Sequence, residues 1–274
     1  MSRKRSTSVR ASPTDRRGIQ HASRGRSGDR RRTVFSRLDA PGVRHTMILP
    51  LKFANPRTSD EAVTYRLAIF DFDGTLADTF PWFVSVLNDV ADRFGFRRVE
   101  TEAEVTALRG MRGQEIMKYL EVPPWKVPLI ARHMRRLASQ DVENIRLFPG
   151  ILPMLEHLRS GGVRLAVVTS NTEENVRRVL GPDGAARFEQ YACGASLFGK
   201  ASRFRQVLKL ARVKPTEAIC IGDEMRDGEA AATVGIPFGA VSWGFSHLDA
   251  LMRCSPREVF ASVEEIATTL TSKR

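Results

Sequence analysis

The chain has 274 residues, 42% of them hydrophobic, which is enough for one large domain or for a domain with an insertion. The formal net charge is +12, but the first 50 residues hold 13 Lys and Arg against three Asp. The rest of the chain is therefore nearly neutral, which argues against a folded domain that binds nucleic acid or a membrane surface by charge. No run approaches the roughly 18 consecutive apolar residues of a membrane-spanning helix.

The N-terminal segment, residues 1–62, is rich in Arg, Ser and Gly and poor in apolar residues. Such a segment cannot bury enough surface to offset its chain entropy, so we expect a disordered basic extension. It lacks the apolar core of a signal peptide. We interpret residues 1–46 as a spectator or a mis-assigned start. A targeting segment or an arm that binds nucleic acid is the less favoured interpretation.

The first predicted strand, Arg66–Phe70, is followed at once by Asp71-Phe72-Asp73-Gly74-Thr75. Because side chains alternate along a strand, Asp71 and Asp73 leave it on the same side and Phe72 points into the core. Two carboxylates this close repel each other and are costly to desolvate. The pair therefore indicates a reaction or a hard cation such as Mg²⁺, although an acidic turn is the plainer alternative.

The next part of the chain, residues 75–151, shows helical periodicity and no convincing strand. We predict a helical cap domain over 81–148, inserted into a core domain made of 63–80 and 149–274. In doubly wound sheets ligands bind outside the carboxyl ends of the strands, so the insertion is well placed to cover a site as a lid. Its two expected apolar faces are Trp82, Phe83, Val86, Leu87, Val90 and Phe94, and Leu129, Ile130, His133, Met134 and Leu137.

The remaining chain alternates strands with helices, which predicts an α/β fold: a Rossmann-like, doubly wound parallel sheet. Several of the strands are continuous apolar runs, as expected of strands that are buried on both faces. The predicted strands are Val163–Thr169, Tyr191–Gly194, Ala218–Ile221 and Phe238–Val241. The predicted helices are Thr172–Leu180, Arg203–Ala211, Glu224–Val234 and Val263–Leu270.

Polar residues follow three of these strands. Thr169-Ser170-Asn171 ends the second strand, Lys200 follows the third, and Asp223 with Asp227 follows the fourth. Each of them alone is an ordinary helix cap, a solvated lysine or an acid at a helix N-terminus. Together with the first acid pair, however, they converge on one edge of the sheet. That edge then combines a nucleophile, metal ligands and cationic and hydroxyl donors, as a site for a phosphate dianion requires.

The ordered set of motifs resembles the haloacid dehalogenase-like hydrolase superfamily. The matching residues are Asp71–Thr75, Thr169, Lys200 and Gly222–Asp227, and the resemblance spans about residues 64–272. The interval between the first two motifs looks like that of the subgroup with a helical cap. Within this subgroup the chain is similar to the phosphoglycolate-phosphatase and β-phosphoglucomutase-like hydrolases.

The resemblance implies roles for the four aspartates. Asp71 would attack phosphorus and form an aspartyl phosphate, and Asp73 would act as general acid and then as general base. Mg²⁺ would be bound by Asp71, by the backbone carbonyl of Asp73, by Asp223 and, directly or through water, by Asp227. Dehalogenases of the superfamily lack the second acid of the first motif, so Asp73 favours a phosphate substrate.

The resemblance also implies a phosphate-binding group. Thr169 and Lys200, with the adjacent Ser170 and Asn171, would hold phosphoryl oxygens. Lys200 would in addition hold the carboxylate of Asp71 in place.

Two features leave alternatives open. Arg109 and Arg112 lie in the most loop-like part of the cap, where either could bind a second anionic group of the substrate, although a solvated surface arginine is favoured. Glu224 follows Asp223 where many relatives have a small polar residue. It either perturbs the metal site or starts the next helix, and the second is favoured.

The sequence therefore predicts a Mg²⁺-dependent phosphomonoester hydrolase acting on a small phosphorylated metabolite. A sugar-phosphate mutase of the β-phosphoglucomutase type is the alternative within enzymes. A protein that binds a phospho-ligand or nucleic acid through its basic tail is the alternative from another class. Three well-separated cysteines without metal-ligand spacing favour a reducing, cytoplasmic location, and no membrane partner is expected.

Overall fold

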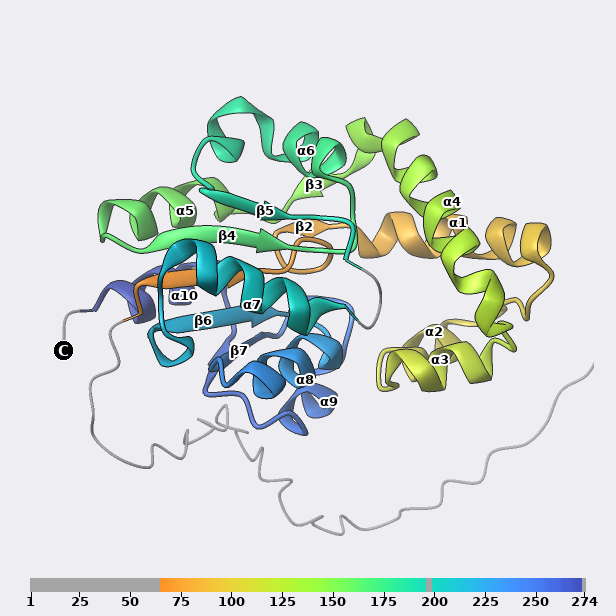
Figure 1. The fold of residues 1–274 in the computed structure, drawn as a ribbon. Helices are drawn as coiled ribbons and strands as arrows, with labels where there is room; N and C mark the ends of the chain where they lie inside the picture. The colour runs from red at the N-terminus through yellow and green to blue at the C-terminus, as the bar shows by residue number, and fades with distance from the viewer. Residues whose placement is uncertain (1–64, 196–198, 273–274) are drawn as a thin grey trace, which may run out of the picture. The chain divides into compact units, whose positions relative to one another are not determined.

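The centre of the fold is a six-stranded sheet, seen in a computed structural model that describes residues 65–195 and 199–272 (Figure 1). The strands lie in the order β5-β4-β1-β6-β7-β8, and all neighbours run parallel. The predicted extension of residues 1–62 lies outside the described residues. The strands are β1 (Leu67–Phe70), β4 (Arg164–Val168), β5 (Gln190–Ala192), β6 (Ala218–Gly222), β7 (Phe238–Val241) and β8 (Glu258–Phe260).

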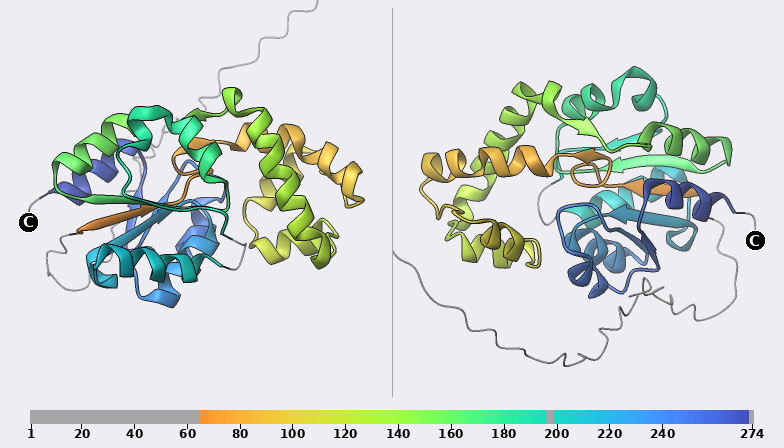
Figure 2. Two further views of the ribbon diagram at one scale, coloured as in Figure 1. Left: turned by 45° about the horizontal axis from the view of Figure 1, so that its top comes forward. Right: turned by 180° about the vertical axis from the view of Figure 1, so that it is seen from behind.

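Helices cover both faces of the sheet, so the predicted α/β architecture is confirmed (Figure 2). Alternate residues of β1 divide between the two faces: Ala68 and Phe70 join one apolar cluster, and Leu67 and Ile69 join the other. The first cluster contains residues of α5 (Ile151–Ser160), α6 (Glu173–Ala185) and α10 (Val263–Thr271). The second contains residues of α7 (Lys200–Ala211), α8 (Met225–Val234) and α9 (Leu248–Met252).

A helical insertion leaves the sheet after β1. Its base is a short antiparallel pair, β2 (Ala77–Asp78) and β3 (Arg146–Leu147). Between these strands lie α1 (Phe80–Phe94), α2 (Glu102–Leu108), α3 (Gly113–Tyr119) and α4 (Val127–Gln140), with short 3₁₀ turns at Pro124–Lys126 and Val142–Asn144. A third 3₁₀ turn, Pro215–Glu217, precedes β6.

Local sequence sets the ends of the inserted helices. α1 has a proline in its first turn and ends at Gly95, which adopts a left-handed conformation with φ 64°. α2 begins with a capping box in which Thr101 and Glu104 bond each other's backbone N–H groups. The insertion buries a small apolar core of its own, formed by Leu87, Val99, Leu108 and Leu120.

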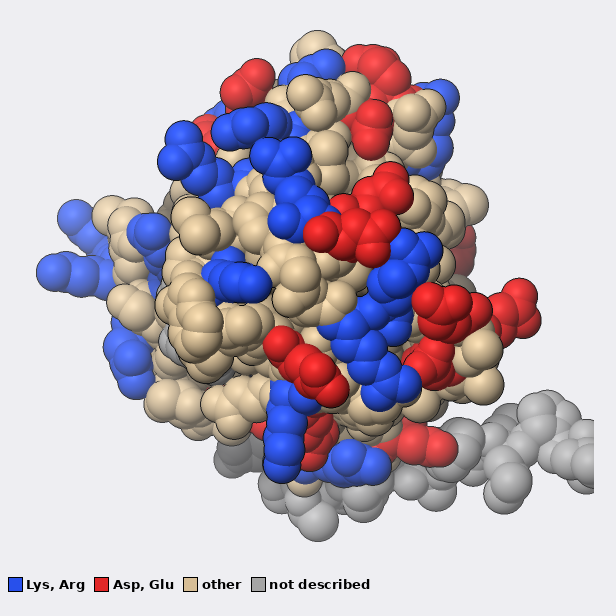
Figure 3. All heavy atoms as spheres, turned by 90° about the vertical axis from the view of Figure 1, so that its right-hand side faces the viewer, with Lys and Arg blue, Asp and Glu red and all other residues tan. Residues whose placement is uncertain are grey.

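The surface over the insertion carries charges of both signs. Lys and Arg side chains and Asp and Glu side chains both lie on the face shown in Figure 3, with other residues between them. Several of these groups form exposed ion pairs, such as that of Arg98 with Asp92. Such pairs contribute little to stability, so the helices of the insertion depend mainly on their small apolar core.

Three sequence-based expectations were wrong in part. The interval from residue 75 to 151 was predicted to contain no strand, yet β2 and β3 lie in it. β8 was not predicted at all. Both errors concern strands of two or three residues, which are too short for a periodic pattern. Leu129 was expected on a buried apolar face but is 56% exposed. Of the residues of α4, Ala138 is the one that is buried.

None of the helices within the described ranges has the length and apolar character to span a membrane.

Candidate active site

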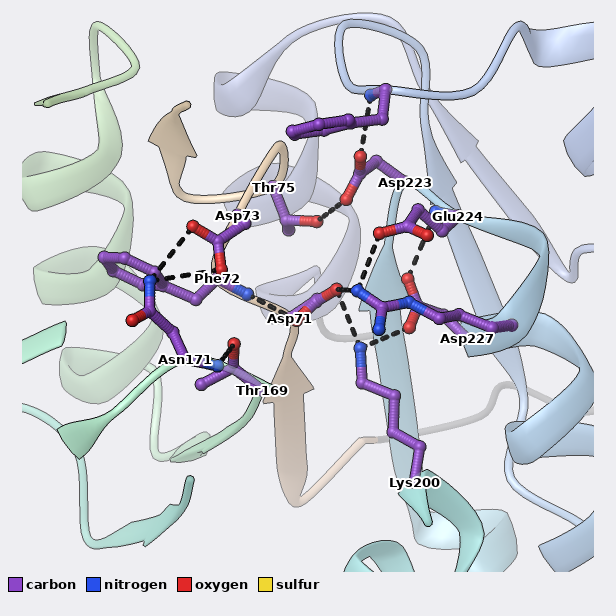
Figure 4. Close-up of polar contacts among 12 residues, drawn as sticks. Asp71, Phe72, Asp73, Thr75, Thr169, Asn171, Lys200, Asp223, Glu224 and Asp227 are labelled. Atoms are coloured by element: carbon purple, nitrogen blue, oxygen red, sulfur yellow. Dashed lines mark hydrogen bonds and ion pairs between the residues drawn. The ribbon is translucent and has the colours of Figure 1, made fainter. Parts of the chain in front are cut away.

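The predicted polar residues meet at the carboxyl edge of the sheet (Figure 4). Asp71 follows β1, Thr169 follows β4, Asp223 follows β6, and Lys200 is the first residue of α7. The chain runs outward from β1 through β4 and β5, and then crosses back to β6 on the other side of β1. Such a reversal opens a crevice at the strand ends, where doubly wound sheets bind ligands.

The carboxylate of Asp71 is held on both sides. Asp71 is only 2% exposed. Its Oδ1 accepts a hydrogen bond from the backbone N–H of Phe72 at 2.8 Å, and its Oδ2 lies 2.7 Å from Lys200 Nζ. Phe72 itself is fully buried, which confirms that it points into the core. The carboxylate therefore has a fixed orientation at the strand end, as a nucleophile requires.

Three buried carboxylates form a cluster. Asp71, Asp223 and Asp227 each place one oxygen within 4.8 Å of the others. Burial and the neighbouring carboxylates raise the pKa of Asp223 well above its usual value, and burial raises that of Asp227 to about 6. Carboxylates in this arrangement are stabilised by a cation with a preference for oxygen ligands, so the donor set fits Mg²⁺.

Lys200 supplies part of the compensating charge. It is 4% exposed and forms ion pairs with both Asp71 and Asp227. Burial alone would lower the pKa of Lys200, but the two carboxylates raise it above its usual value, so the ammonium group stays charged. One cation between two acids orders both of them.

Asp73 faces a different partner. Its two carboxylate oxygens accept hydrogen bonds from Asn171 Nδ2 at 3.2 and 3.3 Å. Burial, with repulsion from Asp71, raises the pKa of Asp73 to about 6, although the bond from Asn171 acts in the opposite direction. A carboxyl group with such a pKa can give and take a proton near neutral pH.

Hydrogen bonds to Asn171 hold the segment after β4 in place. The backbone N–H of Asn171 donates to Thr169 Oγ1 at 3.1 Å, and Asn171 Oδ1 accepts from Asn175 Nδ2 at 3.0 Å. The backbone carbonyl of Ser170 accepts from Arg135 Nη1, which belongs to α4 of the insertion, at 3.4 Å. No motif in the sequence distinguishes Arg135 from the other arginines of the insertion.

Arg226 is a site residue that the motif analysis missed. Its Nη2 lies 2.7 Å from Glu224 Oε1 and 3.9 Å from Asp71 Oδ2. Glu224 is the N-cap of α8, so it does precede the next helix as favoured, but its side chain also binds this second cation. The only available signal was an arginine between two acids of the last motif.

A loop after β7, Trp243–His247, was also missed and is called the bridging loop below. The backbone N–H of Phe245 donates to Asp223 Oδ2 at 2.7 Å. The indole N–H of Trp243 donates to the carbonyl of Thr75 at 3.2 Å, and the Thr75 hydroxyl donates to Asp223 Oδ1 at 2.7 Å. The loop therefore contacts both the first and the last motif.

The two arginines predicted in the insertion contact other parts of the core. Arg109 donates from Nε to the carbonyl of Phe245 at 2.9 Å and from Nη2 to that of Gly244 at 2.8 Å. Arg112 forms an ion pair with Glu229 of α8 at 3.0 Å, in which both side chains are about half exposed. The polar partners of these two side chains belong to the core, and the guanidinium of Arg109 also lies 4.9 Å from the centroid of the Phe80 ring at the start of α1.

The motifs lie within a known family model. The model for haloacid dehalogenase-like hydrolases matches residues 68–241. This range begins in β1 and ends with β7, and so it includes the buried acids, Lys200 and the whole insertion.

Two relatives and one solved structure are similar over most of the chain. Phosphoglycolate phosphatase of Synechococcus elongatus is 29% identical over 204 residues, which cover 74% of this chain and 96% of that protein. Tyrosine-protein kinase PtkA of Mycobacterium tuberculosis is 29% identical over 220 residues, 78% of this chain and 75% of that protein. The crystal structure of a predicted phosphatase from Clostridium acetobutylicum has the same fold, with a TM-score of 0.65 at 22% identity, and covers 77% of this chain and 100% of that one.

Proposed function

The chain belongs to the haloacid dehalogenase-like hydrolase family and is a phosphatase of that family. We propose that it hydrolyses a small phosphorylated metabolite through an aspartyl phosphate. The main support is the buried carboxylate of Asp71, which Phe72 N–H and Lys200 hold at the end of β1. Phosphoglycolate is the first substrate to test, because the similar protein of Synechococcus elongatus is named for it.

The chemistry divides between Asp71 and Asp73. An oxygen of Asp71 attacks phosphorus, and the bond from phosphorus to the leaving oxygen breaks. Asp73 protonates that oxygen, so the product leaves as an alcohol. Asp73 then takes a proton from the water that attacks the aspartyl phosphate, which releases inorganic phosphate and restores both carboxyl groups. The bond from Asn171 aims Asp73 for these transfers.

The acid cluster supports a Mg²⁺ site. Asp71, Asp223 and Asp227, with the backbone carbonyl of Asp73, are the proposed ligands. When bound there, Mg²⁺ would offset the repulsion between the anionic nucleophile and the anionic substrate. Lys200 already neutralises part of the charge and keeps Asp71 and Asp227 in place.

The phosphoryl oxygens are proposed to contact Lys200 and the segment Thr169, Ser170 and Asn171. Lys200, Thr169 and Asn171 lie around the first motif at the same sheet edge (Figure 4), and Ser170 lies between the last two in the chain, so the group offers ammonium, hydroxyl, amide and backbone donors. Arg226 adds a second cation 3.9 Å from Asp71 Oδ2. Cationic donors aimed at a transferring phosphoryl group stabilise the charge of the transition state.

We propose that residues 81–148 act as a cap that selects the substrate, over a core made of 63–80 and 149–274. The support is the position of the insertion: it leaves the chain directly after the first motif, and Arg135 and Arg109 contact the core segments that follow β4 and β7. Arg112 is the weaker candidate for substrate binding, because its side chain forms a half-exposed ion pair with Glu229.

The phosphoryl acceptor distinguishes the proposed hydrolase from its alternatives. In a mutase the acceptor is a sugar hydroxyl, and in a tyrosine kinase, as the mycobacterial relative is named, it is a tyrosine. A non-catalytic binder would transfer nothing. Incubation with phosphoglycolate, glucose 1-phosphate, or ATP and a tyrosine peptide separates these functions, because only hydrolysis releases inorganic phosphate in proportion to substrate consumed.

The decisive test is Asp71→Asn with p-nitrophenyl phosphate and phosphoglycolate. We expect a loss of turnover of about 1000-fold or more, because the amide cannot form the covalent intermediate. Asp183→Asn, which changes an exposed acid, is the matched control and should leave the rate unchanged. Wild-type turnover in the Asp71 variant would exclude the proposed mechanism.

The metal is tested separately. Excess EDTA should abolish turnover, and Mg²⁺ should restore it. In thermal unfolding, Mg²⁺ at 100 times its Kd should stabilise the wild type by about 2.7 kcal/mol. Asp223→Asn, which removes one proposed ligand charge, should lose most of that stabilisation. Full activity in EDTA would contradict the Mg²⁺ assignment.

Location and partners stay predictions. Cys193, Cys220 and Cys254 are free thiols, which supports the predicted reducing cytoplasm. The mixture of charges on the face over the insertion supports a small ligand rather than nucleic acid as the partner.

A further inference from the structure

We infer that Arg109 is a positioning residue, which holds the bridging loop so that Phe245 keeps the metal-binding carboxylate of Asp223 in its orientation. The inference rests on the proposed function, because it takes Asp223 as a Mg²⁺ ligand. It assigns to the insertion a second task besides substrate selection: the insertion completes the metal site from outside.

Four hydrogen bonds join the C-terminal end of α2, at Thr106 and Arg109, to the bridging loop. Arg109 donates to the carbonyls of Phe245 and Gly244 at 2.9 and 2.8 Å. In return, the backbone N–H of His247 donates to the carbonyl of Arg109 at 3.0 Å, and the ring Nε2 of His247 donates to that of Thr106 at 3.1 Å. The planar fork of the guanidinium fixes two adjacent carbonyls at once, which a lysine cannot do with the same geometry.

The other side of the same loop holds Asp223. The N–H of Phe245 donates to Oδ2 at 2.7 Å, and the N–H of Ser246 donates to the backbone carbonyl of Asp223 at 3.3 Å. The Thr75 hydroxyl occupies Oδ1 at 2.7 Å. Each carboxylate oxygen thus has one donor, and one of the two donors belongs to the bridging loop. Bonds to an ionised carboxylate are the stronger kind, so their geometry matters.

The loop lies so close to Asp223 that it cannot shift without moving the acid. A Cβ added to Gly244 would overlap with the side chain of Asp223, and a Cβ added to Gly74 would overlap with Asp223 and with the ring of Phe245. Interiors packed at this density transmit displacements rather than absorb them.

Aromatic packing ties Phe245 to the first helix of the insertion. Its ring meets those of Phe80 and Phe83 edge-on, with centroids 5.1 and 5.6 Å away. The guanidinium of Arg109 lies 4.9 Å from the centroid of Phe80. Phe245 is therefore one residue with three contacts: its N–H on Asp223, its carbonyl on Arg109 and its ring on α1.

This arrangement couples docking of the insertion to metal binding. When the insertion is docked as in this structure, Arg109 fixes the loop, and the loop presents a donor to Asp223. When the Arg109 side chain is absent, the loop loses two of the four hydrogen bonds that join it to the insertion, so the donor that it presents to Asp223 is held less firmly. Because coupling between two equilibria is reciprocal, Mg²⁺ binding should in turn favour the docked insertion.

The test measures Mg²⁺ binding to the full chain without substrate, by isothermal titration calorimetry with MgCl₂. We expect Arg109→Ala to raise the Kd for Mg²⁺ by about 10-fold, the lower end of the effect of losing a group that orients a metal ligand. The Kd of Arg109→Lys for Mg²⁺ should lie between that of Arg109→Ala and that of the wild type. The Mg²⁺ concentration for half-maximal hydrolysis of p-nitrophenyl phosphate should rise in parallel.

Arg112→Ala is the matched control, because Arg112 lies three residues away and also contacts the core, but through an exposed ion pair with Glu229. We expect its Kd to stay within about twofold of the wild type. Equal Kd values for Arg109→Ala and the wild type would overturn the inference alone. An equal loss of Mg²⁺ affinity in Arg109→Ala and Arg112→Ala would also overturn it, because it would show that the insertion had detached from the core in both variants. A wild type that neither binds Mg²⁺ nor hydrolyses the ester would instead overturn the proposed function.

Discussion

The carboxyl edge of the sheet and the helical insertion hold their polar groups in different ways. At the edge, Asp71, Asp223 and Asp227 are almost fully buried and bound on several sides. In the insertion, the core consists of four buried residues, and a contact such as Arg112 with Glu229 is half exposed. The difference teaches that burial and several partners fix the polar groups at the sheet edge, whereas the insertion relies on a smaller apolar core and on more exposed polar contacts.

Among the variants that compare the two regions, the largest effect is expected at the edge, from Asp73→Asn. With an alkyl phosphate such as phosphoglycolate, kcat should fall by about 10²–10⁴-fold, because the leaving alkoxide needs a proton from Asp73. With p-nitrophenyl phosphate the fall should be smaller, since nitrophenolate leaves without one. Steady-state kinetics on both esters test this. An equal fall on the two substrates would remove Asp73 from the role of general acid.

One substitution made in both regions compares their packing directly. Leu165→Ala in β4 and Leu120→Ala in the insertion change residues that are 0% and 5% exposed. Leu→Ala in a core costs about 2–5 kcal/mol, and we expect the sheet variant near the upper end and the insertion variant near the lower end, because the small core can collapse around the cavity.

Denaturant unfolding of the wild type and of both leucine variants gives the free energy of unfolding of each protein, with the m-value as a control on two-state behaviour. Equal losses of stability would show that the insertion is packed as tightly as the sheet, and the contrast between the two regions would fail.

A smaller effect is expected from Arg226→Gln. It removes a positive charge 3.9 Å from Asp71 Oδ2 while keeping a polar side chain. We expect kcat/KM to fall about tenfold or more, and Arg226→Lys to recover part of it. Arg253→Gln changes an exposed arginine that follows α9 in the sheet domain; it is the control and should have no effect on kcat/KM. Unchanged kinetics of Arg226→Gln would show that Lys200 suffices as the fixed cation.

The smallest effect is expected from deletion of residues 1–46. Because the proposed reaction uses only residues of the sheet edge and the insertion, kcat/KM should change less than twofold, about 0.4 kcal/mol. A change in both turnover and binding of DNA or RNA would show that the basic segment has a function in the protein.

Much of the fold followed from local patterns. The strand LAIF of β1, the run Leu165–Val168 of β4 and the strand AICIG of β6 are continuous because both faces are covered, and this pattern is typical of buried parallel strands. β8, with only three residues, and β2 and β3, with two each, carry no such pattern, because they pair only where the rest of the fold brings a partner beside them.

The sequence by itself determined which residues follow the strands, and therefore that Asp71, Thr169, Lys200 and Asp223 gather at one edge, since parallel strands end on the same side. Only the tertiary structure decided what surrounds them. Arg109 meets the bridging loop across more than 130 residues of chain, and no periodicity or local propensity encodes such a contact. It arises from the way the insertion docks, which depends on the packed shape of both parts.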